Sequence, residues 1–198
     1  RICLVGSEMC IRDRLDDAIS SDGLKNETIE IDSQPDGNKI KLLNIRPDNE
    51  DILPCVYYIH GGGMEIGSCF YKLYQAFGRL IAHQNVSVIM VDFRNARVPS
   101  SVPEVAPFPA GLNDCVSGFD YIKTNAKKLN IDSERIVISG ESGGGNLTLA
   151  TGMKLSQAGR SNEVKGLYAL CPYIAGIWPL PENPSSTAVS YTHLTLPT

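Results

Sequence analysis

The chain has 198 residues, of which 42% are hydrophobic and 20% are charged, and its formal net charge is −4. This is the composition of a globular protein with one sizeable core, and the mild acidity gives no electrostatic basis for binding nucleic acid or an anionic membrane. No apolar run approaches the roughly 20 residues that a membrane-spanning helix needs. We therefore expect no nucleic-acid partner and no membrane span.

The cysteine pattern argues against a disulfide framework and against a metal site. The six cysteines are Cys3, Cys10, Cys55, Cys69, Cys115 and Cys171. They form no C-x-x-C pair and show no metal-ligand spacing, and scattered single cysteines are typical of a reducing compartment. Residues 1–14 lack the apolar segment and the cleavage site of a signal peptide. These features predict a cytoplasmic protein.

Both ends of the chain resemble translated sequencing-library adapters. The resemblance covers Leu4–Arg14 and Val189–Thr198. Codons can be chosen for these two stretches that are reverse complements of each other, as adapters at opposite ends of one insert are. We therefore expect residues 1–14 and 188–198 to be non-native segments. Residues 15–187 are then expected to be an internal fragment of a longer parent protein.

The first predicted elements are a short helical segment and a β-hairpin. Leu15–Lys25 has weak helical patterning that breaks at a Ser-Asp-Gly sequence. Thr28–Asp32 and Lys39–Arg46 alternate apolar and polar residues, and Gln34–Gly37 between them has the composition of a turn. These features predict two antiparallel strands.

Two buried strands and a helix are predicted next. Cys55–Ile59 and Val86–Val91 are short apolar runs rich in β-branched residues, which is typical of strands covered on both faces. Between them, Phe70–Gln84 has an apolar stripe with helical spacing. The proline-rich segment Val98–Pro109 is predicted to be a loop.

The second half of the chain continues the alternation of helix and strand. Helices are predicted at Leu112–Leu129 and Gly143–Gln157, and strands at Arg135–Ser139 and Val164–Cys171. Pro172–Pro184 is predicted to be a proline-rich loop. Alternating strands and helices indicate an α/β fold of one domain, with a mainly parallel sheet and helices on both faces.

Gly140–Gly144 fits the pattern G-x-S-x-G, with Ser142 as its serine. In a nucleophile elbow with this pattern, the serine lies on a sharp turn from strand to helix and its Oγ is exposed. The predicted strand before the motif and helix after it are the expected context. Ser142 is therefore the candidate nucleophile, and the N–H of Gly143 lies at the helix start, where an anion is favoured.

The second motif is the glycine run that follows His60, directly after a predicted strand. Gly61, Gly62 and Gly63 have no Cβ to keep a substrate from their N–H groups. A plain tight loop and a phosphate cradle are the alternatives, but neither glycine run has the lysine of a nucleotide-binding loop or fits G-x-G-x-x-G. We therefore expect Gly61, Gly62, Gly63 and Gly143 to form an oxyanion hole for acyl transfer at an ester or amide carbonyl.

The sequence offers no convincing acid to complete a catalytic triad. Asp92 and Asp114 precede the serine, whereas the order with this elbow is serine, acid, histidine. Asp92 is expected to fix the loop after its strand and Asp114 the start of its helix. Glu163 lies at the N-terminal end of a predicted strand, away from the site. Glu182 lies in the proline-rich loop, and no native histidine follows it for the acid to orient.

No convincing histidine is present either. His60 belongs to the glycine loop, and we interpret it as a structural residue that shapes this loop. His83 closes a predicted helix and is expected at the surface. His193 lies in the adapter-like end and is not considered as a catalytic base.

Four ordered motifs resemble those of the hormone-sensitive-lipase-like group of α/β-hydrolases. They are His60–Gly63, Asp92–Arg94, Pro107–Ala110 and Gly140–Asn146, in the family's order. The resemblance implies an α/β-hydrolase fold and a carboxylic-ester hydrolase, with an acid and a histidine supplied by later loops that this chain lacks. The one departure within the motifs is Gly143, where the family usually has alanine.

The resemblance also implies a partly N-terminal cap over the acyl pocket, of which residues 15–25 would be a remnant. The expected activity is hydrolysis of a small-molecule ester through an acyl-enzyme on Ser142, with no cofactor and no metal. Because the acid and histidine are missing, we expect the fragment itself to be inactive. The alternative is a non-catalytic small-molecule receptor on a hydrolase scaffold, which would keep the serine and the glycine loop but lose the histidine.

Overall fold

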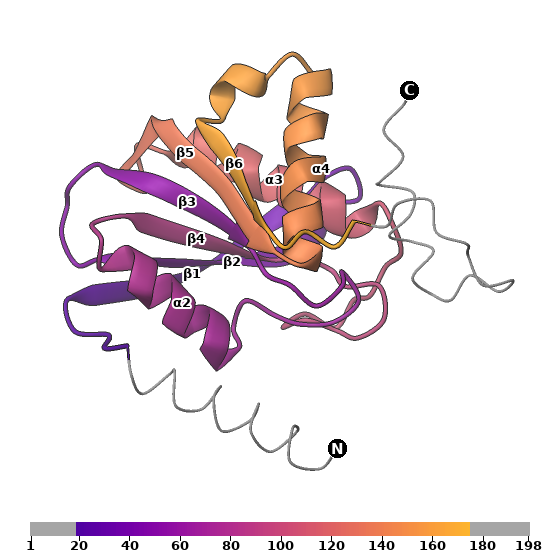
Figure 1. Ribbon diagram of the computed structural model, residues 1–198, viewed down its shortest axis with the longest axis horizontal. Helices are drawn as coiled ribbons and strands as arrows, with labels where there is room; N and C mark the ends of the chain where they lie inside the picture. Colours follow the sequence, from indigo (N-terminus) through magenta and orange to yellow (C-terminus); the bar gives the residue numbers. More distant parts are fainter. Residues whose placement is uncertain (1–18, 175–198) are drawn as a thin grey trace, which may run out of the picture.

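The computed structural model describes residues 19–174. The predicted adapter-like segments 1–14 and 188–198 lie outside the described residues. So do residues 15–18 of the expected cap remnant and most of the predicted loop at Pro172–Pro184. The described residues form a six-stranded sheet with the strand order β1-β2-β4-β3-β5-β6 (Figure 1).

The predicted hairpin is confirmed, and its strands are longer than predicted. β1 (Leu24–Ser33) and β2 (Asn38–Pro47) pair antiparallel over their full lengths. The weak helical patterning of Leu15–Lys25 was predicted to break at the Ser-Asp-Gly sequence, and the chain does turn there before β1 begins. Leu24 and Lys25, after this break, pair with the end of β2.

The sheet is mainly parallel, as predicted. β3 (Leu53–Ile59), β4 (Ser87–Asp92), β5 (Ile131–Glu141) and β6 (Gly166–Leu170) run parallel to one another, while β2 joins β4 antiparallel. The antiparallel hairpin is therefore an extension at one edge of a parallel sheet.

Helices cover both faces of this sheet (Figure 1). α2 (Lys72–Ala82) packs on one face against β2 and β4, whereas α3 (Ala110–Asn125) and α4 (Gly143–Gln157) pack on the other. A short 3₁₀ turn, η1 (Ser161–Glu163), precedes β6. None of the helices formed within residues 19–174 has the length and apolar character needed to cross a bilayer.

Strand β4 shows why the middle of each central strand is apolar. All of its residues are buried, with Val88 and Met90 on the α2 face and Ile89 and Val91 on the α3/α4 face. Successive side chains of a strand point to opposite faces, so a strand covered on both sides needs an unbroken apolar run. This is the pattern from which the strand was predicted.

A buried ion pair ties the β1–β2 turn to α3 and to the loop after β4. Asp114 on α3 is fully buried and accepts hydrogen bonds from the Arg94 backbone N–H (2.8 Å), Nε (3.0 Å) and Nη2 (2.7 Å). Arg94 also reaches Asp36 in the β1–β2 turn (2.6 Å), and Ser33 donates to Asp114. Asp114 therefore holds Arg94 and the hairpin, rather than the start of its own helix as expected from the sequence. Its carboxylate raises the pKa of Arg94.

We expect Asp114→Ala to lower the free energy of unfolding by about 3–5 kcal/mol, because it removes the buried partner of Arg94 and leaves this buried charge only the half-exposed Asp36. Urea unfolding of the wild type and the variant measures this difference. The matched control is Asp132→Ala, which removes a partly exposed partner of Arg135 and should cost about 1 kcal/mol or less. Equal losses in the two variants would contradict the prediction.

Candidate active site

The two glycine motifs meet because they follow neighbouring parallel strands. β3 and β5 pair in a register that places Ile59 opposite Gly140. The glycine loop begins one residue after Ile59, and Ser142 comes two residues after Gly140. Parallel strands end at the same edge of a sheet, and this edge is where α/β proteins bind their ligands.

Ser142 has the strained backbone of a nucleophile elbow. Its φ is 54° and its ψ is −118°, a conformation that L-residues rarely adopt. Its N–H donates to the Leu170 carbonyl at the end of β6 (2.9 Å). Its carbonyl accepts from the N–H groups of Asn146 (3.1 Å) and Tyr173 (2.8 Å). Bonds on both sides of the residue hold the turn, and Ser142 remains partly exposed.

The elbow needs glycine at two positions because the chain approaches itself closely there. A Cβ on Gly144 would lie 2.0 Å from the Ile59 carbonyl oxygen, and a Cβ on Gly140 would lie 2.5 Å from the Gly144 carbonyl oxygen. Both distances are far below van der Waals contact. The glycines of the motif therefore let α4 start directly against the ends of β3 and β5.

The glycine loop lies against the first residue of α4. A Cβ on Gly143 would be 2.7 Å from the Gly63 nitrogen and 2.8 Å from the Met64 nitrogen. Gly62 and Gly63 both have positive φ angles, 109° and 65°. Their N–H groups donate to no acceptor among residues 19–174. The loop thus brings backbone donors without partners close to the start of the helix that follows Ser142.

Gly61 differs from the other expected oxyanion donors. Its N–H donates to Oε1 of Glu141 (3.1 Å), so in this structure it is already engaged. The same oxygen accepts from the Tyr74 hydroxyl (2.8 Å), and Oε2 accepts from the Tyr58 hydroxyl (2.9 Å). Sequence reasoning missed Glu141 and the two tyrosines, although the position of Glu141 directly before the serine was a signal.

His60 is buried beneath the loop, in agreement with its interpretation as a structural residue. Its Nδ1 lies 2.7 Å from the Gly61 carbonyl oxygen, which can only accept, so Nδ1 carries the proton. The ring stacks on Phe93 with 4.3 Å between centroids. Among the described residues Nε2 has no hydrogen-bond partner and is buried, and this burial lowers the pKa of the imidazole. His60 is therefore neutral and already committed to the loop.

The remaining candidate acids and bases have other partners. The exposed His83 lies 2.8 Å from the Ser20 carbonyl through its Nε2. Asp92 accepts from the N–H groups of Cys69 (3.1 Å) and Ser101 (2.8 Å), and so fixes the proline-rich loop as expected. Glu163 pairs with Arg160. No histidine or carboxylate within residues 19–174 forms a hydrogen bond with the Ser142 side chain, and both His193 and Glu182 lie outside the described residues.

A cleft of about 660 Å³ opens beside Ser142. Residues from the glycine loop, from the start of α2 and from the elbow line it; they are Gly61, Gly62, Ile66, Gly67, Phe70, Tyr71, Lys72, Leu73, Tyr74, Glu141 and Ser142. The walls are mainly apolar and aromatic, and polar groups gather at the serine. Such a cleft has the size and character of a site for a small organic molecule.

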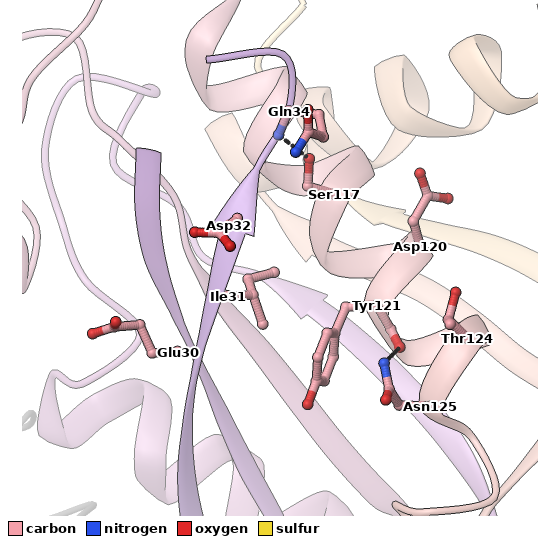
Figure 2. Close-up of a pocket in the computed structure, with 9 residues that line it drawn as sticks. All are labelled: Glu30, Ile31, Asp32, Gln34, Ser117, Asp120, Tyr121, Thr124 and Asn125. Carbon is pink, nitrogen blue, oxygen red and sulfur yellow. Dashed lines mark hydrogen bonds between the residues drawn. The ribbon is translucent and has the colours of Figure 1, made fainter. Parts of the chain in front are cut away.

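A second hollow, of about 390 Å³, lies between β1 and α3 (Figure 2). Of its acidic residues, Asp32 pairs with Lys39 and Asp120 pairs with Arg160. The Gln34 N–H donates to Ser117 at the rim (2.9 Å). No group of His, Cys, Asp and Glu side chains suited to a metal ion occurs within residues 19–174. The Ser142 cleft is therefore the candidate active site.

Comparison with known families and proteins agrees with this fold. The profile of the alpha/beta hydrolase fold family matches residues 56–196. Among curated proteins, the chain is 31% identical over 142 residues to a putative alpha/beta hydrolase, R526, of Acanthamoeba polyphaga mimivirus. This alignment covers 69% of the chain and 38% of the viral protein.

Solved esterase structures are also similar to this chain. Esterase Est22 is 56% identical, with a TM-score of 0.81, over 92% of this chain and 56% of Est22. A brefeldin A esterase, described as a bacterial homologue of human hormone-sensitive lipase, is 32% identical. Its TM-score is 0.72, over 87% of this chain and 49% of the esterase. The chain thus spans about half the length of these esterases.

We expect Gly144→Ala to lower the free energy of unfolding by about 1–3 kcal/mol, because the new methyl group would collide with the Ile59 carbonyl. Chemical unfolding of both forms tests this. Gly166→Ala is the matched control, since a Cβ at Gly166 would meet no atom within 4 Å. A Gly144→Ala variant as stable as this control would argue against the close approach at the elbow.

The lowered pKa of His60 predicts a pH dependence of stability. The folded state disfavours the imidazolium, whereas the unfolded state protonates near the ordinary value of 6.5. The stabilisation is therefore fully present above pH 6.5 and is lost progressively as the pH falls below it. We expect His60→Gln, which does not titrate, to show a smaller loss of unfolding free energy between pH 7 and about pH 5. Equal losses in wild type and variant would contradict the lowered pKa.

Proposed function

This chain belongs to the α/β-hydrolase family, in its hormone-sensitive-lipase-like branch, and we propose that its parent protein hydrolyses carboxylic esters with Ser142 as the nucleophile. The observation that carries the proposal is the strained backbone of Ser142 at the edge where the glycine loop meets α4. Such a turn costs stability, and strain of this kind is concentrated at functional sites.

In the proposed reaction, Ser142 Oγ attacks the ester carbonyl and an alcohol leaves, so that an acyl-enzyme forms. Water then releases the carboxylic acid. The negative oxygen of each tetrahedral intermediate is bound by the N–H groups of Gly62, Gly63 and Gly143. Support for this assignment comes from the absence of other acceptors for Gly62 and Gly63 within residues 19–174 and from the contact between Gly63 and Gly143.

The general base and its acidic partner remain to be supplied. We propose that both come from parts of the parent protein beyond this chain, which spans 56% of the length of esterase Est22. Within residues 19–174, His60 is buried under the glycine loop and His83 contacts Ser20, so neither is available to Ser142. On this proposal the chain alone has the nucleophile and the oxyanion donors but little activity.

The proposed substrate is a small ester that fits the 660 Å³ cleft beside Ser142. Ile66, Phe70, Tyr71 and Leu73 supply apolar and aromatic surface for its acyl or alcohol group. The reaction as proposed needs no cofactor and no metal. The cytoplasmic location remains a prediction from the scattered cysteines, and the four cysteines within residues 19–174 are free thiols.

We expect Ser142→Ala in the parent protein to lower kcat for a short-chain aryl ester by about 10⁶-fold, the loss seen when the serine is removed from a Ser-His-Asp triad on an unrelated fold. Steady-state release of the phenol measures this rate. Ser156→Ala is the matched control, because Ser156 is an exposed residue on the same helix. It should leave kcat unchanged.

Two outcomes would argue against the proposal. If Ser142→Ala retained full activity, another residue would be the nucleophile. If the wild-type parent bound small esters but did not turn them over, the receptor alternative would be favoured. A histidine after a late strand of the parent sequence would support the enzyme.

A further inference from the structure

We propose that Glu141 is a positioning residue: by accepting a hydrogen bond from the N–H of Gly61, it fixes the position of the glycine loop relative to Ser142. The inference rests on the proposed function, since it assigns a role within the same site. It also gives Gly61 a different role from its neighbours: Gly61 anchors the loop, and Gly62 and Gly63 bind the substrate.

The Glu141 carboxylate joins four parts of the structure. It lies at the end of β5, directly before Ser142, and accepts from Tyr58 on β3, from Tyr74 on α2 and from Gly61 in the loop, at 2.9, 2.8 and 3.1 Å. A carboxylate is suited to this place because it accepts several hydrogen bonds and donates none. Each of its two oxygens has at least one donor.

Gly61 is held from both sides. Its N–H donates to Glu141, and its carbonyl oxygen accepts from the buried Nδ1 of His60 (2.7 Å). The peptide planes on either side of Gly61 therefore have fixed orientations. Because the chain turns from there into Gly62 and Gly63, the direction of the next two N–H groups depends on this anchor.

The close contact explains why residue 61 is glycine. A Cβ at this position would lie 2.4 Å from Glu141 Oε1. Its absence allows the carboxylate to reach the backbone directly, without an intervening side chain. Because Glu141 binds the glycine loop and is the neighbour of Ser142 in the chain, a shift of the loop would also move Ser142.

Preorganised donors stabilise a developing oxyanion only if their directions are fixed before the reaction. Without Glu141, the N–H of Gly61 would lose its acceptor and the loop could rotate about His60. The ground state, in which the carbonyl carries little charge, would be affected less than the tetrahedral intermediate. The loss should therefore appear in kcat rather than in KM.

The test compares Glu141→Ala and Glu141→Gln in the parent protein, with kcat and KM for an aryl ester and the affinity for an aryl trifluoromethyl ketone. The serine Oγ adds to the carbonyl carbon of this ketone and passes its proton to the general base, so that a tetrahedral hemiketal oxyanion forms. We expect Glu141→Ala to lower kcat at least about tenfold and to weaken ketone binding by a similar factor, while KM stays within about twofold. Glu141→Gln keeps an acceptor for Gly61 and should recover most of both losses.

Glu134→Ala is the matched control, because Glu134 is an exposed carboxylate on the same strand. It should leave kcat and ketone affinity unchanged. Unchanged kcat and ketone affinity in Glu141→Ala would overturn the inference. So would a fall in kcat without weaker ketone binding, or a Glu141→Gln variant as impaired as Glu141→Ala. None of these results touches the assignment of Ser142, which Ser142→Ala tests separately.

If Glu141→Ala does not fold, amide hydrogen exchange in the wild-type protein tests whether the Gly61 N–H is held by Glu141. The Gly61 N–H should exchange slowly because it is bonded to Glu141, whereas the Gly62 and Gly63 N–H groups should exchange faster. Exchange at Gly61 as fast as at Gly62 would overturn the inference.

Discussion

The parallel pairing of β3 with β5 is the constraint on which the rest of the site depends. It places Ile59 opposite Gly140, so that the glycine loop and the nucleophile elbow leave the sheet side by side. The motifs are about eighty residues apart in the sequence. Their meeting requires the crossover through α2, β4 and α3 to pack back onto the sheet, and both hydrophobic cores stabilise this arrangement.

Buried and partly buried polar contacts then give the sheet edge its detailed shape. On one side, Asp114 and Arg94 connect the hairpin to the loop after β4. At the candidate site, Glu141 connects the end of β5 to Gly61 and to two tyrosines. Apolar packing is not directional, whereas hydrogen bonds are, so contacts of this kind specify one orientation of a loop among many of similar burial. The proposed oxyanion hole depends on such directional contacts, because its backbone N–H groups have to point at the substrate.

The surrounding hydrogen bonds hold Ser142 in its strained backbone conformation. The residue keeps a rare backbone conformation because Leu170, Asn146 and Tyr173 bond to its main chain, and because Gly140 and Gly144 let the helix approach. β6 therefore supports the backbone of the proposed nucleophile, in addition to being the last strand of the described sheet. The stability of the fold and the geometry of the site are coupled at this strand.

Much of the architecture could be predicted from local patterns. Apolar runs at β3 and β4 and the helical stripe of α2 predicted buried strands and a covering helix, because periodicity records which faces meet the core. The start of β1 was missed, because its register comes from pairing with β2 and not from its own residues. The role of Asp114 was misjudged for the same reason, since its partner Arg94 reaches it only in the folded chain.

The sequence by itself determined where the candidate site lies and which chemistry is proposed for it, because a serine between glycines after a buried strand, with a glycine loop upstream, meets steric requirements that can be recognised locally. Only the tertiary structure decided which donors are available. Gly61, Gly62 and Gly63 are chemically identical along the chain, and Gly61 differs because Glu141 lies 3.1 Å from its nitrogen. A hydrogen bond between distant residues depends on distances and directions in space, which residue order alone does not specify.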